Sequence, residues 1–138
     1  MKIAVDFDGT IVEHKYPDIG VEIPFAIKTL KLLQKEGHQV ILWTVREGDL
    51  LQDAVAYCHK RGLDFFAINA SFPGEIFDSL SYSRKIKADL FIDNASLGGL
   101  PDWGDIYKMI VCKITISDLL EVSALCNKPK KKRWLSLR

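Results

Sequence analysis

The sequence has few cysteines, no long apolar run and almost no net charge, and each of these shortages excludes a class of protein. Its three cysteines, Cys58, Cys112 and Cys126, are far apart and match neither zinc nor redox spacing. An odd number without a CxxC pair suits a reducing compartment, so we expect a cytoplasmic protein whose cysteines are small core residues. The net charge of +1 creates no global field that attracts nucleic acid or membranes.

The apolar segments are too short for a membrane protein. No run approaches the length of a spanning helix, and three apolar residues between Lys2 and Asp6 are too few for a secretory signal. We therefore expect no membrane partner. The chain of 138 residues, 48% hydrophobic and 27% charged, fits one globular domain. We expect this domain to cover residues 1–126 and residues 127–138, with their Lys-Pro-Lys-Lys-Lys-Arg stretch, to form a mobile basic tail.

Short apolar runs alternate with segments of helical periodicity. The apolar runs predict buried strands over residues 3–5, 40–43, 65–68 and 90–92. Helices are predicted from Pro24 to a stop at Gly37, from an N-cap at Asp49 to about Gly62, and over residues 102–111 and 117–126. This alternation indicates βαβ units. The sequence therefore predicts an α/β domain with a mainly parallel sheet and helices on both faces.

Polar side chains follow several of these strands. Asp6 and Asp8 follow the first strand, Thr44 the second and Asp93 the fourth, and Lys85 lies shortly before the fourth. In parallel sheets, ligands bind beyond the carboxyl ends of the strands, so we expect these groups to converge on one crevice. Three clustered carboxylates require a neutralising cation, and ligands that are all oxygen suit Mg²⁺ rather than zinc.

These elements, in this order, resemble the haloacid dehalogenase-like (HAD) superfamily of phosphohydrolases. The resemblance rests on DFDGT at residues 6–10, Thr44 after a strand, KIKAD at residues 85–89 and FIDN at residues 91–94. It covers about residues 1–112. It implies a three-layer Rossmann-like fold, usually with the strand order 3-2-1-4-5, that hydrolyses a phosphate monoester with Mg²⁺ as cofactor.

The resemblance also implies a role for each matched residue. Asp6 would attack phosphorus and form an aspartyl-phosphate, and Asp8 would protonate the leaving alcohol and then activate water. Thr44 would donate a hydrogen bond to the phosphoryl group, and Lys85 would bind that group and neutralise its charge. Asp6, Asp93 and the backbone carbonyl of Asp8 would bind Mg²⁺. Positioning and charge neutralisation are the main requirements of phosphoryl transfer, so the residue types fit these roles.

Three details of the pattern affect these expectations. Lys85 is preferred to Lys87 because the family's lysine stands three residues before the pair that opens the strand. Many relatives carry two adjacent acids where this chain has Asp93 and Asn94; we expect Mg²⁺ binding to survive this difference, and whether Asn94 weakens it stays open. Relatives with a cap domain carry it in segments that are short loops here, residues 11–23 and 69–83, so we expect no large cap. Specificity then comes from these loops or from a partner subunit in a homo-oligomer.

Two further residues lie beside the predicted crevice. Arg46, two residues past Thr44, is predicted to bind substrate, and a solvated surface pair is an equal alternative. Trp103 is predicted to pack against the sheet in preference to lining the crevice, since large aromatic side chains usually pack.

Three alternative functions stay open from the sequence alone. A phosphate-receiving signalling domain also combines acids, Thr, Lys and Mg²⁺, but the order Asp6, Thr44, Lys85, Asp93 favours hydrolysis. A binding module without turnover would engage nucleic acid through the basic tail, and a nucleic-acid end phosphatase would use the same tail. A small-molecule phosphate ester is the favoured substrate, because the tail is the sole support for nucleic acid.

Overall fold

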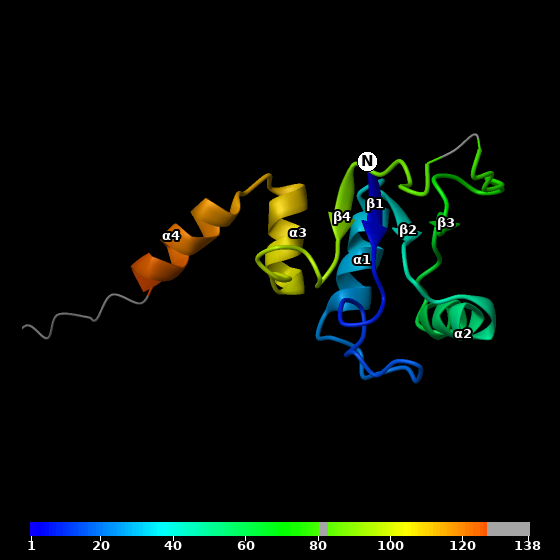
Figure 1. Ribbon diagram of the computed structural model, residues 1–138. Coiled ribbons are helices and arrows are strands. Elements are labelled where there is room, and N and C mark those ends of the chain that lie inside the picture. The colour runs from blue at the N-terminus through cyan, green and yellow to red at the C-terminus, as the bar shows by residue number, and fades with distance from the viewer. Residues whose placement is uncertain (81–82, 127–138) are drawn as a thin grey trace, which may run out of the picture.

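A parallel four-stranded sheet forms the centre of the computed structural model, which describes residues 1–80 and 83–126 (Figure 1). The predicted basic tail lies outside these described residues. The strands are β1 (Lys2–Val5), β2 (Gln39–Leu42), β3 (Ala67–Ile68) and β4 (Leu90–Ile92), in the order β3-β2-β1-β4. Val5 pairs with both Leu42 and Ile92, so β1, β2 and β4 end at the same level. This common level is what brings the residues after each strand to one edge.

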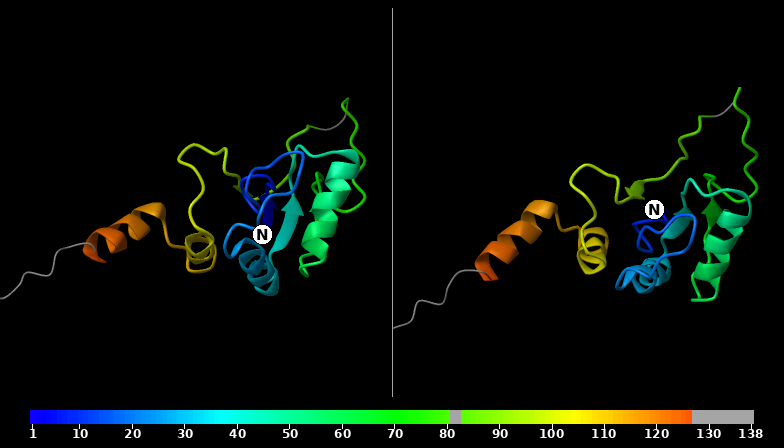
Figure 2. Two further views of the ribbon diagram at one scale, coloured as in Figure 1. Left: turned by 90° about the horizontal axis from the view of Figure 1, so that it is seen from below. Right: turned by 60° about the horizontal axis from the view of Figure 1, so that its bottom comes forward.

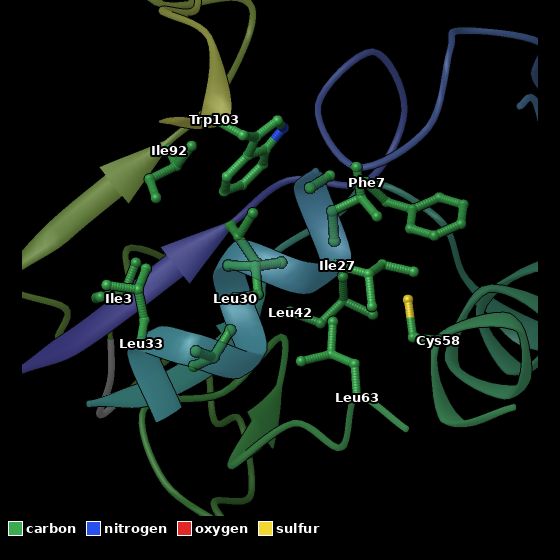
Figure 3. Close-up of a cluster of buried hydrophobic side chains, with 14 of the residues drawn as sticks. Ile3, Phe7, Ile27, Leu30, Leu33, Leu42, Cys58, Leu63, Ile92 and Trp103 are labelled. Atoms are coloured by element: carbon green, nitrogen blue, oxygen red, sulfur yellow. The ribbon is translucent and has the colours of Figure 1, made fainter. Parts of the chain in front are cut away.

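Three helices cover one face of the sheet. Helices α1 (Ala26–Lys35), α2 (Gly48–His59) and α3 (Trp103–Val111) contribute to the same buried cluster as Ile3 and Val5 of β1 (Figure 3). Helices α1 and α3 lie side by side (Figure 2). Fully burying a Leu, Ile or Phe side chain contributes about 1.5–3 kcal/mol, so this cluster is the main source of stability.

The opposite face is covered by the connection between β3 and β4. Ile86 from this connection packs with Ala4, Ile41 and Ala67 of the sheet. The described residues of the connection contain no helix, so an irregular layer takes the place of the helices predicted for this face. The three-layer, Rossmann-like α/β class and the lack of a large cap are confirmed. The four strands have the order implied by the resemblance, and no fifth strand occurs within the described residues.

The helix boundaries differ in detail from the prediction. Helix α1 begins two residues after Pro24, and α2 begins at Gly48 with Glu47 as its N-cap. Asp49 therefore lies inside α2, and the prediction that it caps this helix is wrong. Helix α4 (Ile116–Cys126) extends away from the sheet (Figure 1). None of the helices in the described part of the chain is long and apolar enough to cross a membrane.

Cys58 and Cys112 have opposite environments. Cys58 is in the core, where burial raises the pKa of its thiol to about 12, whereas Cys112 is exposed and the core role predicted for it is wrong.

We expect iodoacetamide to alkylate Cys112 in the native protein and Cys58 only after unfolding, because the thiolate is the reacting form. Peptide mapping after labelling measures this, and rapid alkylation of Cys58 in the native protein would contradict its buried placement.

Candidate active site

The ends of β1 and β4 bring Asp6 and Asp93 to the same edge of the sheet. The Asp6 N–H donates to the Ile92 carbonyl over 3.0 Å, which ties Asp6 to the last residue of β4, and Asp93 follows directly. Thr44 lies two residues past the end of β2, the other neighbour of β1. Two predicted carboxylates and the predicted hydroxyl therefore follow three neighbouring strands at one edge.

Asp6 is a weak acid for an aspartate. The pKa of its carboxyl rises from the usual 3.8 to about 6, and burial is the largest cause. The neighbouring charges of Asp93 and Asp8 also raise this pKa, whereas hydrogen bonds from Phe7 and Thr10 lower it. The ionised carboxylate is therefore costly in the metal-free protein. A cation at this edge would offset both the burial and the repulsion between carboxylates.

Thr10 connects the loop after β1 with the loop after β4. Its buried hydroxyl accepts a hydrogen bond from the Asn94 N–H over 3.1 Å. The same oxygen lies 3.1 Å from Asp6 Oδ2 and 3.2 Å from Asn94 Oδ1, and because it carries one proton it donates to one of them at a time. Asn94, which stands where many HAD proteins have a second acid, thus orders the two loops without adding a third negative charge beside Asp6.

Gly9 allows these two loops to approach each other. It has φ +85°, and a Cβ built on it would lie 2.6 Å from Asn94 Nδ2, so an alanine side chain would push the Asn94 amide away from Thr10. We expect Gly9→Ala to lose more than the roughly 1–2 kcal/mol that a left-handed backbone costs alone. Gly37→Ala is the matched control, since Gly37 has φ +84° and no atom within 4 Å of the added Cβ. Urea unfolding compares the two, and equal losses would contradict close packing at Gly9.

The carboxylate of Asp8 is held by Arg46. Arg46 Nε donates to Asp8 Oδ2 and Arg46 Nη2 to Asp8 Oδ1, each over 2.7 Å, and the Arg46 side chain is 0% exposed. The guanidinium also donates to the carbonyls of Pro17 and Asp18, over 2.9 and 2.7 Å. The alternative of a solvated surface pair for Arg46 is therefore wrong. Substrate binding by Arg46 stays a prediction, since its described partners are Asp8 and the loop after β1.

Two aromatic rings complete the surroundings of the Arg46 guanidinium. Its central carbon lies 5.2 Å from the ring centroid of Phe7 and 5.3 Å from that of Tyr16. Ring contacts of this kind and a bidentate carboxylate together fix the orientation of a guanidinium. Arg46 thereby joins the end of β1, the loop that contains Tyr16 and the segment after β2.

Thr44 is oriented by Asn69, a residue that the sequence prediction missed. Asn69 follows β3 at φ +49°, and its side-chain carbonyl accepts from the Thr44 N–H over 2.8 Å. The Thr44 hydroxyl accepts from the Arg46 N–H over 3.2 Å, which leaves its own proton for donation to a ligand. The sequence did contain a sign of this role, because Asn69 follows the third strand as Thr44 follows the second, and Asn adopts positive φ more readily than most residues.

Among the described residues, Lys85 forms no ion pair with Asp6, Asp8 or Asp93. It is exposed on the segment that leads into β4, with its ammonium 5.8 Å from the ring centroid of Phe91 and its N–H donating to Ser83 Oγ over 3.2 Å. Lys85 therefore precedes the start of β4, whereas Asp93 follows its end. Neutralisation of a phosphoryl group by Lys85 stays a prediction.

Trp103 is buried, as predicted, and it also contacts the loop of the aspartates. It is 1% exposed, and its indole N–H donates to the Thr10 carbonyl over 3.1 Å. None of the sequence motifs predicted this hydrogen bond between Trp103 and Thr10.

Comparison with known proteins connects the chain to a protein of solved structure. The chain matches no family model and no curated protein. A solved structure, described as that of a conserved protein coded by a locus from Bacteroides thetaiotaomicron, is 60% identical in sequence, and the match covers 86% of this chain and 96% of that chain with a TM-score of 0.81. Identity and coverage at this level mean that the two chains share their fold along most of their length. The chain belongs to the same family as this conserved protein of Bacteroides thetaiotaomicron.

Proposed function

We propose that the chain is a Mg²⁺-dependent phosphohydrolase of the HAD type, which hydrolyses a phosphate monoester through an aspartyl-phosphate on Asp6. The observation that carries the proposal is the placement of Asp6 and Asp93 at adjacent strand ends, with Thr44 after the next strand. Ligands of open parallel sheets bind at this edge. The sequence resemblance supplies the reaction class, and the cytoplasmic location expected from the cysteines belongs to the same proposal.

The oxygen donors at this edge fit Mg²⁺. The carboxylates of Asp6 and Asp93 and the backbone carbonyl of Asp8 form a set of hard ligands. Among the described residues, no group of three or more His, Cys, Asp and Glu side chains gathers as a metal site, which agrees with the Asp8 carboxylate facing Arg46. The proposed ligand from Asp8 is its carbonyl, so the direction of its side chain removes no ligand. When bound, the cation neutralises charge on the phosphoryl oxygens and on the carboxylates.

The chemical steps are divided between Asp6 and Asp8. The Asp6 carboxylate attacks phosphorus, the bond to the leaving oxygen breaks, and Asp8 transfers its proton to that oxygen. Water then attacks phosphorus and gives a proton to Asp8, while the bond between phosphorus and Asp6 breaks and phosphate leaves. The Thr44 hydroxyl donates to a phosphoryl oxygen in both steps, where it stabilises developing charge.

The mechanism requires Asp8 to turn away from Arg46. Both oxygens of Asp8 accept from the guanidinium, and its side chain is 8% exposed. Proton transfer to a substrate oxygen needs hydrogen-bond distance, so the proposed cycle includes a rotation of Asp8 toward the crevice. Arg46 retains its bonds to the Pro17 and Asp18 carbonyls during this rotation, which keeps the loop after β1 anchored.

The lack of a large cap favours an open crevice. Selection of the phosphate ester then depends on the loops at residues 11–23 and 69–83 or on a partner subunit. A small-molecule ester is the substrate class that we propose. A nucleic-acid end as substrate depends on the basic tail, which is outside the described residues.

Release of phosphate from a panel of phosphate monoesters, with Mg²⁺ or with EDTA, tests this proposal. Asp6→Asn removes the nucleophile, and Asp64→Asn is the matched control, because Asp64 is an exposed acid paired with His59. We expect Mg²⁺-dependent release that Asp6→Asn loses and Asp64→Asn retains. Uptake of one phosphoryl group without turnover would indicate a phosphate-accepting domain, and a folded protein that neither binds Mg²⁺ nor releases phosphate would indicate a binding module.

A further inference from the structure

A buried tryptophan joins helix α3 to the loop that carries the proposed nucleophile. Trp103 is the first residue of α3, and its indole N–H donates to the Thr10 carbonyl over 3.1 Å. Figure 3 shows the indole nitrogen turned toward the loop that follows β1. Thr10 is 0% exposed and Trp103 is 1% exposed, so this carbonyl depends on a protein donor rather than on water.

Rigid elements fix the position of Trp103 itself. From α1, the Thr29 hydroxyl donates to the Trp103 carbonyl over 3.3 Å, and this bond is buried. Asp102 caps the first turn of α3 by accepting from the Asp105 N–H over 2.9 Å. Because α1 and α3 also pack against each other, the place of Trp103 does not depend on the Thr29 bond alone.

Thr10 connects Trp103 to both sides of the crevice by hydrogen bonds. Its carbonyl is bonded to Trp103, while its hydroxyl accepts from the Asn94 N–H and reaches Asp6 Oδ2. Asp6 lies on the loop after β1, and Asn94 directly follows Asp93 on the loop after β4. The path from Trp103 to Asp6 and the path through Asn94 to Asp93 therefore both pass through Thr10.

We propose that Trp103 is a positioning residue that sets the placement of Asp6 relative to the Asp93–Asn94 loop, and thereby the affinity of the site for Mg²⁺. The inference rests on the proposed function for its cation, and it adds a residue that lies outside the family motifs. Changes to the partners of metal ligands typically cost about 10–100-fold in metal affinity or activity. A tryptophan that only filled the core would affect stability and leave Mg²⁺ affinity unchanged.

The test compares Trp103→Phe with Thr29→Val. Trp103→Phe keeps an aromatic ring but removes the donor to Thr10, and Thr29→Val removes the bond on the far side of the same tryptophan. Mg²⁺ affinity is measured without substrate, from the thermal shift of the full chain as Mg²⁺ is titrated. We expect Trp103→Phe to weaken affinity about 10-fold and Thr29→Val to leave it within about 2-fold. Unchanged affinity in Trp103→Phe, or an equal loss in both variants, would overturn the proposal.

A second readout does not depend on the metal. The Asn94 N–H is bonded to the Thr10 hydroxyl, so its rate of exchange with deuterium reports whether Thr10 is held in place. We expect faster exchange at Asn94 in Trp103→Phe and the wild-type rate in Thr29→Val. Failure of the proposed function would appear as a wild-type protein without any Mg²⁺ shift. Failure of the positioning role would appear as an unchanged exchange rate at Asn94 in Trp103→Phe.

Discussion

Asp6→Asn is expected to be more stable than the wild-type protein above pH 6 in metal-free buffer, although it removes the proposed nucleophile. The pKa of the Asp6 carboxyl rises from 3.8, the value of an exposed aspartate, to about 6 in the folded protein, mainly through burial. Such a rise corresponds to roughly 3 kcal/mol at about 1.4 kcal/mol per pH unit, which we reduce to about 1–2 kcal/mol because the group is partly solvated. Asparagine retains an acceptor for Thr10 without the charge.

The pH dependence of this gain has a definite sign. Protonated Asp6 is favoured by the fold, so its stabilising effect is complete below pH 3.8 and is lost as the pH rises through about 6. The advantage of Asp6→Asn is therefore largest above pH 6, shrinks toward pH 3.8 and disappears below it. Urea unfolding across this pH range measures the difference in stability. Added Mg²⁺ should raise the unfolding free energy of the wild-type protein but not that of the variant. A variant less stable than wild type above pH 6 would contradict a costly carboxylate.

Arg46→Ala is expected to lose about 3–5 kcal/mol of unfolding free energy, because it leaves the Asp8 carboxylate almost buried and unpaired. The carbonyls of Pro17 and Asp18 lose their donors in the same variant. Arg61→Ala is the matched control. The Arg61 side chain is 41% exposed, and its Nε lies 3.6 Å from Glu22 Oε2, so we expect this variant to lose less than about 1 kcal/mol of unfolding free energy. Urea unfolding of both variants measures the difference.

A double-mutant cycle of Arg46→Ala with Asp8→Ala measures the interaction energy between the two side chains. Each single variant leaves one charge without its partner, whereas the double variant removes both. We expect the loss of unfolding free energy in the double variant to be smaller than the summed losses of the two single variants. The difference should exceed about 1 kcal/mol, which is typical of residues in contact. Additive losses would mean that Arg46 stabilises the protein through the loop carbonyls and not through Asp8.

The position of the candidate site was predictable from the sequence because it follows from the backbone. Apolar runs that alternate with helical segments predict a parallel sheet, and parallel strands place whatever follows them at one edge. Asp6, Thr44 and Asp93 each follow a strand within two residues. Short-range pattern therefore sufficed for these three, and it also sufficed for the class of fold.

The contacts that tune the site were not predictable, because they join segments far apart in the chain. Arg46 is buried by Asp8 and by carbonyls of the loop at Pro17, 29 residues away in sequence. Trp103 meets Thr10 across 93 residues. Single-sequence patterns record periodicity and spacing, and neither determines which distant carbonyl a buried donor reaches.

Lys85 was predicted for the crevice from its spacing to the strand. Lys85 lies on the connection that crosses one face of the sheet before β4, next to Ile86, which packs on Ala4, Ile41 and Ala67. Its ammonium lies over Phe91, in the middle of β4. The order of the motifs therefore matches the resemblance, although no ion pair joins Lys85 to Asp93 in the described part of the chain.

The most direct test of the account is to trap the phosphoryl group on Asp6. Asp8→Asn cannot activate water, and p-nitrophenyl phosphate has a leaving group that needs no proton, so the covalent intermediate should accumulate in this variant. After incubation with Mg²⁺ and an acid quench, peptide mass spectrometry locates the modification. The account predicts a phosphoryl group on Asp6 that is absent from Asp6→Asn. Consumption of substrate by the Asp8→Asn variant with Asp6 unmodified would contradict it.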